Sequence, residues 1–154
     1  MMEAVSVPPF ERFYETWSGE ILAFLRRRLG SAEAEDAFQE TFLRALRGYG
    51  RLEHGRELRA WAYTIAARVV ADTHRRRRPA GEPVEGAGVD TRPAYAEIEH
   101  LAGDLPPTER AAVVLRYGYD LSYEDIGAAL GSNAVAARQA ASSGIRRLRR
   151  KELQ

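Results

Sequence analysis

A stretch rich in proline, glycine and acidic residues lies in the middle of the chain and limits what the chain can fold into. Residues 79–93 read PAGEPVEGAGVDTRP, with three prolines, three glycines and three acids. This composition neither continues a helix nor buries a core, so it predicts a linker. Treated as a flexible coil, the linker has a root-mean-square span of roughly 20 Å. We therefore expect two small domains, at residues 10–78 and 95–152, joined by a linker at 79–94.

Apolar residues recur every three or four positions in the first half, which is the spacing of a helix face. One helix is predicted from Phe10 to Leu29, ended by Gly30, with Ser31 placed to cap the next. The next two are predicted at 32–46 and 56–77. Their apolar sides comprise Phe38, Phe42, Ala45 and Leu46 in the former, and Leu58, Trp61, Ala62, Ile65, Ala66 and Val69 in the latter.

The second half is also predicted to be helical, so the fold class is all-α. A short helix is expected at 95–103, and Pro106-Pro107 opens another that runs through Tyr117. Ser122 has the spacing of a capping box with Asp125, and the short helix that it starts stops at Gly131. Ser132 or Asn133 caps a last helix that runs to about residue 150. Together these segments outline a helix-turn-helix, in which Gly127 allows close approach of the two helices.

Charge is segregated along the chain although the formal net charge is only +1. Residues 56–78 and 138–154 each carry a net charge of about +5, and the segment between them is acidic. Of the 23 basic residues only Lys151 is a lysine. Two cationic blocks favour two contacts with a polyanion, and solvated helix faces are the alternative.

The last helix supplies candidate DNA contacts, because the second helix of this motif enters the major groove. Its first half carries Asn133, Arg138, Gln139 and Ser142, whose side chains suit base edges. Arg146 and the arginines that follow suit phosphates. The alternative is a helical hairpin with a basic tail.

The first half offers a cationic end and an acidic face. Arg75–Arg78 lie at the end of the third helix. They either bind phosphates of a nucleic acid or oppose the negative end of the helix dipole. Trp61 is expected either to stack on bases exposed from a duplex or to belong to the core. Asp36 and Glu40 lie four residues apart on one helix face, which suits either docking on a basic protein or plain solvation.

Enzymatic and membrane functions find little support. The chain has no cysteine and three scattered histidines, and it shows no phosphate loop or nucleophile elbow, so we expect no catalytic residue, metal or cofactor. No apolar run is long enough to cross a bilayer, and the amino terminus does not resemble a signal peptide. A cytoplasmic protein without membrane insertion is expected.

Several motifs, taken in order, resemble one family. They are DAFQETFLRA at 36–45, WAYTIA at 61–66 followed by 72–78, LPPTER at 105–110, LRY at 115–117 and LSYEDIG at 121–127. The set resembles the bacterial RNA polymerase sigma factors of the extracytoplasmic-function group, over about residues 10–78 and 96–150.

The resemblance implies a dissociable, non-enzymatic subunit that binds core RNA polymerase and directs it to promoter DNA in transcription initiation. Region two would hold the polymerase through Asp36, Gln39, Glu40 and Phe42. It would melt the minus-ten element with Arg51, Arg56, Trp61, Arg68, Asp72 and Arg75–Arg78. Region four would read the minus-thirty-five element through the last helix. An anti-sigma protein is a further partner that the resemblance implies.

Two other functions remain open. The chain could be a stand-alone helix-turn-helix regulator of transcription that never contacts polymerase, or a helical adaptor that binds only proteins. The last helix departs from the family pattern, with alanine at 136, 137, 140 and 141. Such a helix binds DNA mainly through phosphates and shape, or it favours a protein partner.

Overall fold

The computed structural model describes residues 6–52, 55, 57–77 and 99–152. The chain divides into two compact units, Met1–Thr73 and His74–Gln154. Every regular element in the described residues is helical, which confirms the all-α prediction. The predicted linker at 79–94 lies outside the described residues.

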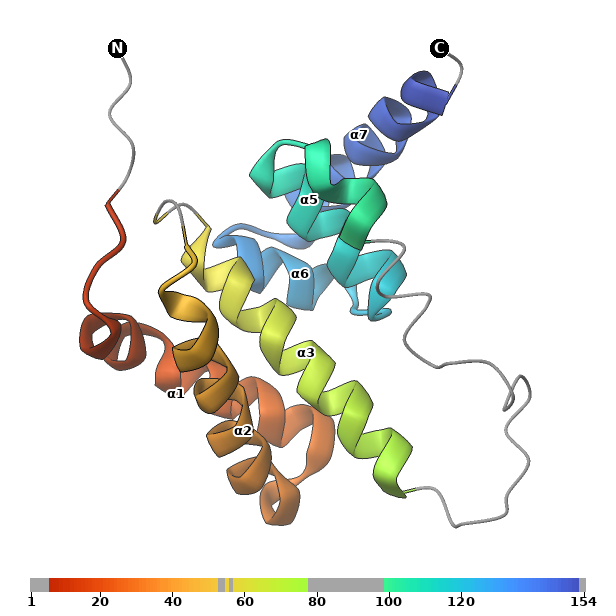
Figure 1. The fold of residues 1–154 in the computed structure, drawn as a ribbon. Helices are drawn as coiled ribbons and strands as arrows, with labels where there is room; N and C mark the ends of the chain where they lie inside the picture. The colour runs from red at the N-terminus through yellow and green to blue at the C-terminus, as the bar shows by residue number, and fades with distance from the viewer. Residues whose placement is uncertain (1–5, 53–54, 56, 78–98, 153–154) are drawn as a thin grey trace. The chain divides into compact units, whose positions relative to one another are not determined.

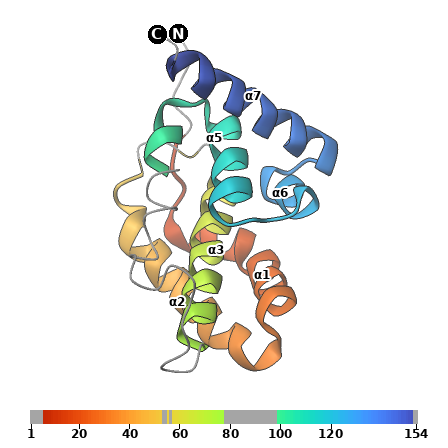
Figure 2. The same ribbon diagram turned by 90° about the vertical axis from the view of Figure 1, so that its right-hand side faces the viewer.

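The first unit is built on α1 (Phe10–Leu29), α2 (Ser31–Tyr49) and α3 (Leu58–Arg77) as far as Thr73, and these helices pack side by side (Figure 1, Figure 2). Gly30 separates α1 from α2 with φ at 82°, a conformation that glycine adopts without strain. The core contains Phe13, Ile21, Phe24 and Leu25 of α1, Ala34, Ala37 and Ala45 of α2, and Ala62, Tyr63, Ala66 and Val69 of α3.

Aromatic rings close the end of this unit where α1 begins. Phe13 lies 5.4 Å from Tyr49 and 5.6 Å from Trp61 between ring centroids. The hydroxyl of Tyr49 also donates to the carbonyl of Pro8. These contacts explain why α2 continues to Tyr49, past Gly48, rather than stopping near residue 46 as predicted.

Three other expectations for the first unit were wrong. Ser31 makes no capping bond, because α2 already begins at this residue. Leu46 is 53% exposed and does not belong to the buried side of α2. The third helix starts at Leu58, since the preceding Glu57 has φ at 57°, outside the helical region.

The second unit comprises η1 (Ala102–Asp104), α5 (Pro107–Val113), a π-helical turn η2 (Val114–Gly118), α6 (Tyr123–Leu130) and α7 (Ala134–Glu152). The helix α7 crosses α5 and α6, and both of them pack on it (Figure 1, Figure 2). The helix predicted at 107–117 is α-helical to Val113 and ends in the π-helical turn, at Gly118. Of the predicted helix 95–103, residues 95–98 lie outside the described residues, and 99–101 are helical.

The helix-turn-helix forms as its sequence predicts. The amide of Asp125 donates to Ser122 Oγ at 3.1 Å, and Gly131 ends α6 with φ at 70°. Asn133, rather than Ser132, caps α7 by accepting from the amide of Ala136 at 2.9 Å. A Cβ at Gly127 would lie 2.5 Å from the carbonyl carbon of Asn133, so only glycine fits this crossing. Ile126, Ala137 and Ala141 are fully buried at the contact.

Candidate nucleic-acid and protein interfaces

The predicted docking residues of α2 divide between its surface and its interior. Asp36 and Gln39 are exposed in the first half of the helix, whereas Glu40 is half-buried. Phe42 is only 7% exposed, with its ring 4.9 Å from Phe38 and 5.0 Å from Tyr14. Phe42 therefore holds α2 in place from within and offers a partner little surface.

Sequence reasoning missed two apolar residues on the outer side of α2. Leu43 is 47% exposed and Leu46 is 53% exposed. They follow Asp36 and Gln39 at helical spacing, so the four side chains form one face. We call Asp36, Gln39, Leu43 and Leu46 the α2 face. The signal was present, because position 43 lies two turns beyond Asp36, but Leu46 was assigned to the apolar side of the helix and Leu43 was given no role.

An ion-pair network joins α2 to α3. Arg44 donates to Glu40 at 2.8 Å and contacts a carboxylate oxygen of Asp72 at 3.0 Å. Burial alone would lower the pKa of Arg44, but these hydrogen bonds and charges outweigh it, so the pKa is raised. Two residues predicted for different partners, Glu40 and Asp72, are thus held by one arginine that sequence reasoning did not single out.

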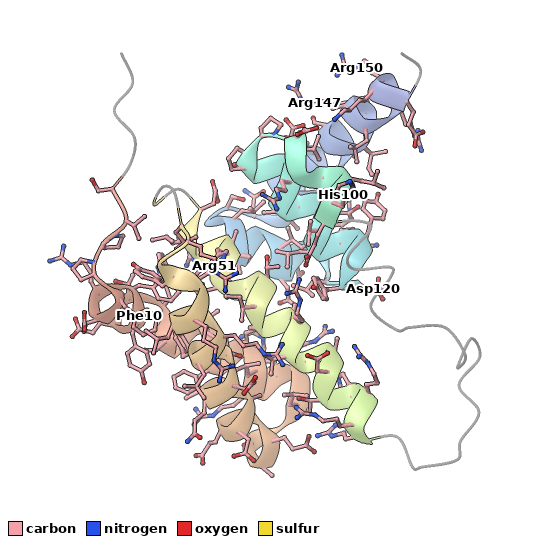
Figure 3. All side chains as sticks on the ribbon, viewed as in Figure 1. Phe10, Arg51, His100, Asp120, Arg147 and Arg150 are labelled. Carbon is pink, nitrogen blue, oxygen red and sulfur yellow. The ribbon has the colours of Figure 1, made fainter. Side chains whose placement is uncertain are left out.

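The α3 residues predicted to contact DNA lie mostly at the surface. Arg68 is exposed, and Asp72 and Arg75 share its side of the helix at spacings of four and three. Arg76 and Arg77 are exposed in the last turn, where they also oppose the negative end of the helix dipole. Arg51 is exposed in the turn after α2 (Figure 3). Arg56 and Arg78 lie outside the described residues.

Trp61 is half-buried and belongs to the aromatic cluster of the first unit. Its ring also lies 6.2 Å from that of Tyr49, and a Cβ on Gly48 would lie 3.4 Å from it. These contacts favour the core role that the sequence left open.

A second polar cluster braces α1 against α3. Arg59 donates to Glu20 at 2.8 Å, and its guanidinium lies 5.0 Å from the ring centroid of Trp17. The hydrogen bond from Arg59 lowers the pKa of Glu20, against burial, which would raise it. Burial raises the pKa of Tyr63, and the nearby Glu20 adds to the effect. Sequence periodicity carries no signal for this pairing across 39 residues.

The outward side of α7 carries most of the predicted base-reading residues. Arg138, Gln139, Ser142 and Arg146 are exposed, whereas Ala137, Ala141 and Gly144 face α5 and α6 and are buried. Asn133 is exposed, but its side-chain oxygen is used as the cap of α7. Figure 3 shows Arg147 and Arg150 near the far end of the helix. Arg147 pairs with Glu109 of α5 at 2.8 Å and thereby ties the two helices together.

Arg138 is placed by an aromatic ring that sequence reasoning missed. The guanidinium carbon of Arg138 lies 5.2 Å from the ring centroid of Tyr123, and that of Arg116 lies 4.5 Å from it. Arg116 is itself fixed by a 3.0 Å hydrogen bond to the carbonyl of Leu121. The ring thus gathers two cations at the start of α6.

No cluster of three potential metal-ligating side chains occurs in the part of the chain that the structure describes. Among the same residues, no helix has the length and apolar character needed to span a bilayer.

Comparisons with known proteins match both units. The family model for sigma-70 region 2 matches residues 13–80, and that for sigma-70 region 4 matches residues 102–150. The chain is 31% identical to the ECF RNA polymerase sigma factor BldN of Streptomyces coelicolor, over 96% of this chain and 62% of that protein. It is 34% identical to the RNA polymerase sigma factor CarQ of Myxococcus xanthus, over 91% of this chain and 87% of CarQ.

One solved structure with some likeness is that of the sigma factor RpoE in complex with the anti-sigma factor NepR from Bartonella quintana. It is 22% identical, covers 92% of this chain and 94% of that chain, and gives a TM-score of 0.45.

Proposed function

Because the chain belongs to the extracytoplasmic-function group of the sigma-70 family, we propose that it binds core RNA polymerase and directs it to promoters in transcription initiation. The observation that carries the proposal is the pair of family matches, which follow one another in order and together span both units. The chain contributes binding and positioning, while the polymerase performs the catalysis. Its place of action is the cytoplasm, where the template and the polymerase lie.

The α2 face is the proposed contact with polymerase. Acidic and polar side chains at its start favour a basic partner surface, and they steer the encounter. Leu43 and Leu46 supply apolar area that is removed from water on docking, at about 25 cal/mol per Å². Glu40 adds charge at the edge of this surface, although Arg44 already neutralises part of it.

The α3 surface and the turn at Arg51 are the proposed contact with the minus-ten element. Opening the duplex costs a few kcal/mol for each base taken from the stack, so this surface must hold the exposed strand. Exposed arginines at 51, 68, 76 and 77 offer phosphate contacts. We propose phosphate contacts for Arg56 and Arg78 as well. Trp61 supports this surface through its place in the aromatic cluster.

The outward side of α7 is the proposed contact with the minus-thirty-five element. Arg138, Gln139 and Ser142 lie in the first half of the helix, where this motif reaches base edges. Arg146 follows one turn later and suits a phosphate, with its guanidinium steadied at 3.1 Å by Ser143. Asn133 serves the α7 cap, and a base contact through its remaining amide protons is part of the proposal.

The predicted linker gives the two contacts an advantage in binding. Once one domain is bound, the other searches a volume set by the linker length, which raises its effective concentration. The domain boundaries predicted at 78/79 and 94/95 belong to this proposal. An anti-sigma protein that covers the α2 face would block the polymerase contact, and this is the inhibitory partner that we propose.

The test is run-off transcription with core polymerase on a promoter library, with and without this protein. We expect a defined subset of templates to be transcribed only in its presence. A stand-alone regulator would bind DNA without polymerase and would leave the template choice of core polymerase unchanged. An adaptor that binds only proteins would add no salt-dependent DNA binding to the polymerase complex.

A further inference from the structure

Val135 is an exposed apolar side chain at the start of α7. It is 63% exposed, and it is the second residue of the helix. On the described part of α7, Ile145 and Leu148 are half-buried, so Val135 is the large apolar side chain of this helix that is left at the surface. The packing of the helices therefore does not explain a valine at this position.

The helical geometry places Val135 among the proposed DNA-reading residues. At 3.6 residues per turn, it lies about 20° around the helix from Ser142, about 40° from Gln139 and about 60° from Arg138. By the same geometry, Ala137 and Gly144 lie about 160–180° away, and both are buried. Val135 therefore points away from α5 and α6, on the side that carries the polar candidates.

The neighbours of Val135 leave it accessible to a groove. Ala134 and Ala136 flank it, and neither has a long side chain that could cover it. The amide oxygen of Asn133 is turned into the helix cap. An alanine-rich start lets the helix backbone approach the bases closely, with one apolar group projecting beyond it.

Of the groups on base edges in the major groove, the thymine 5-methyl is the apolar one, and it is read by apolar contact. We infer that Val135 is a specificity-determining residue that packs against a thymine methyl in the upstream promoter element. The inference rests on the proposed function. It also means that the alanine-rich helix reads at least one base directly, rather than through phosphates and shape alone.

The test combines a substitution that removes both γ-methyl groups of Val135 with one that removes the methyl group of a thymine. Upstream duplexes are first selected from a random library by core polymerase reconstituted with the full chain. Each thymine of the selected element is then replaced singly by deoxyuridine, and the affinity of the complex is measured with the wild-type chain and with Val135→Ala. Leu101→Ala is the matched control, because Leu101 is 56% exposed but lies outside α7.

At one thymine, we expect deoxyuridine to weaken binding by the wild type about fourfold, the effect of removing one buried methyl. The same substitution should leave binding by Val135→Ala nearly unchanged, while Leu101→Ala should keep the wild-type pattern. If every thymine responds equally in wild type and Val135→Ala, the methyl contact is refuted and the proposed function stands. If the reconstituted complex enriches no duplex more than core polymerase alone does, both the methyl contact and the proposed function are refuted.

Discussion

Substituting alanine for Gly127 is expected to destabilise the α6–α7 crossing selectively. The added Cβ would lie 2.5 Å from the carbonyl carbon, 2.7 Å from the carbonyl oxygen and 2.9 Å from the Cα of Asn133. These are backbone atoms, so they cannot rotate aside as the end of a side chain can. Asn133 also caps α7, and the amide of Ser132 donates to the carbonyl of Gly127 at 2.7 Å. Any shift that relieves the clash disturbs both interactions.

The expected magnitude combines three effects. Overpacking costs about 1–3 kcal/mol, here near the upper end because the obstacle is backbone. Disturbing the Asn133 cap adds about 1 kcal/mol. Alanine recovers about 1 kcal/mol over glycine in helix propensity. The free energy of opening of α6 and α7 should therefore fall by about 2–3 kcal/mol.

Hydrogen exchange measured amide by amide is the suitable assay, because the two units need not unfold together. Amides of α6 and α7 should lose protection in Gly127→Ala, while amides of α1 and α2 serve as the internal reference. Gly19→Ala is the matched control, since no atom lies within 4 Å of its Cβ, and its helix should gain slightly in stability. Unchanged or increased protection of α6 and α7 in Gly127→Ala would refute the steric argument.

Three further predictions concern charged side chains between residues 20 and 78. Arg44→Ala should lower the free energy of unfolding by about 1–2 kcal/mol, because the ion pair between Arg44 and Asp72 is only partly exposed. A double-mutant cycle with Asp72→Asn should show a coupling energy of about 1 kcal/mol. Additive effects of the two substitutions would contradict this ion pair. The folded-state pKa of Glu20 is lowered from 4.5, so its contribution to stability is present above pH 4.5 and disappears as pH falls through the lower folded value. Glu20→Gln should therefore weaken the fall in the free energy of unfolding at acidic pH, measured by urea titrations at a series of pH values. The same fall in the wild type and in Glu20→Gln would count against the Arg59 contact. Replacing Arg75–Arg78 by alanine should reduce the slope of log affinity against log salt by about 0.7–0.9 for each phosphate that is no longer neutralised, and an unchanged slope would remove these arginines from the interface.

Helices with strict apolar spacing were predictable from the sequence, because their packing depends on local periodicity. The first helix was predicted with the bounds Phe10–Leu29 that the structure has. The cap at Ser122, the stop at Gly131 and the close approach at Gly127 were confirmed as well. Each of these features depends on residues that lie close together in the sequence.

Features that depend on distant residues were not predictable in this way. The extension of α2 to Tyr49 rests on rings from α1 and α3, and Arg44 and Arg59 find partners on other helices. The exposure of Leu43 and Leu46 escaped for another reason. Hydrophobic patterning placed Leu46 on the core side and gave Leu43 no role, because an apolar contact surface has the same sequence pattern as buried packing.

In the proposed function, α2 binds core RNA polymerase while α7 binds DNA. The most direct test is the affinity of the purified chain for core polymerase, measured with the wild type, with Asp36→Lys and with Glu15→Lys, an exposed control on α1. We expect the wild type and Glu15→Lys to bind alike, and Asp36→Lys to bind at least about tenfold more weakly, a difference of about 1.4 kcal/mol. Equal affinity of all three, or no binding of the wild type at any salt concentration, would show that α2 is not the polymerase contact.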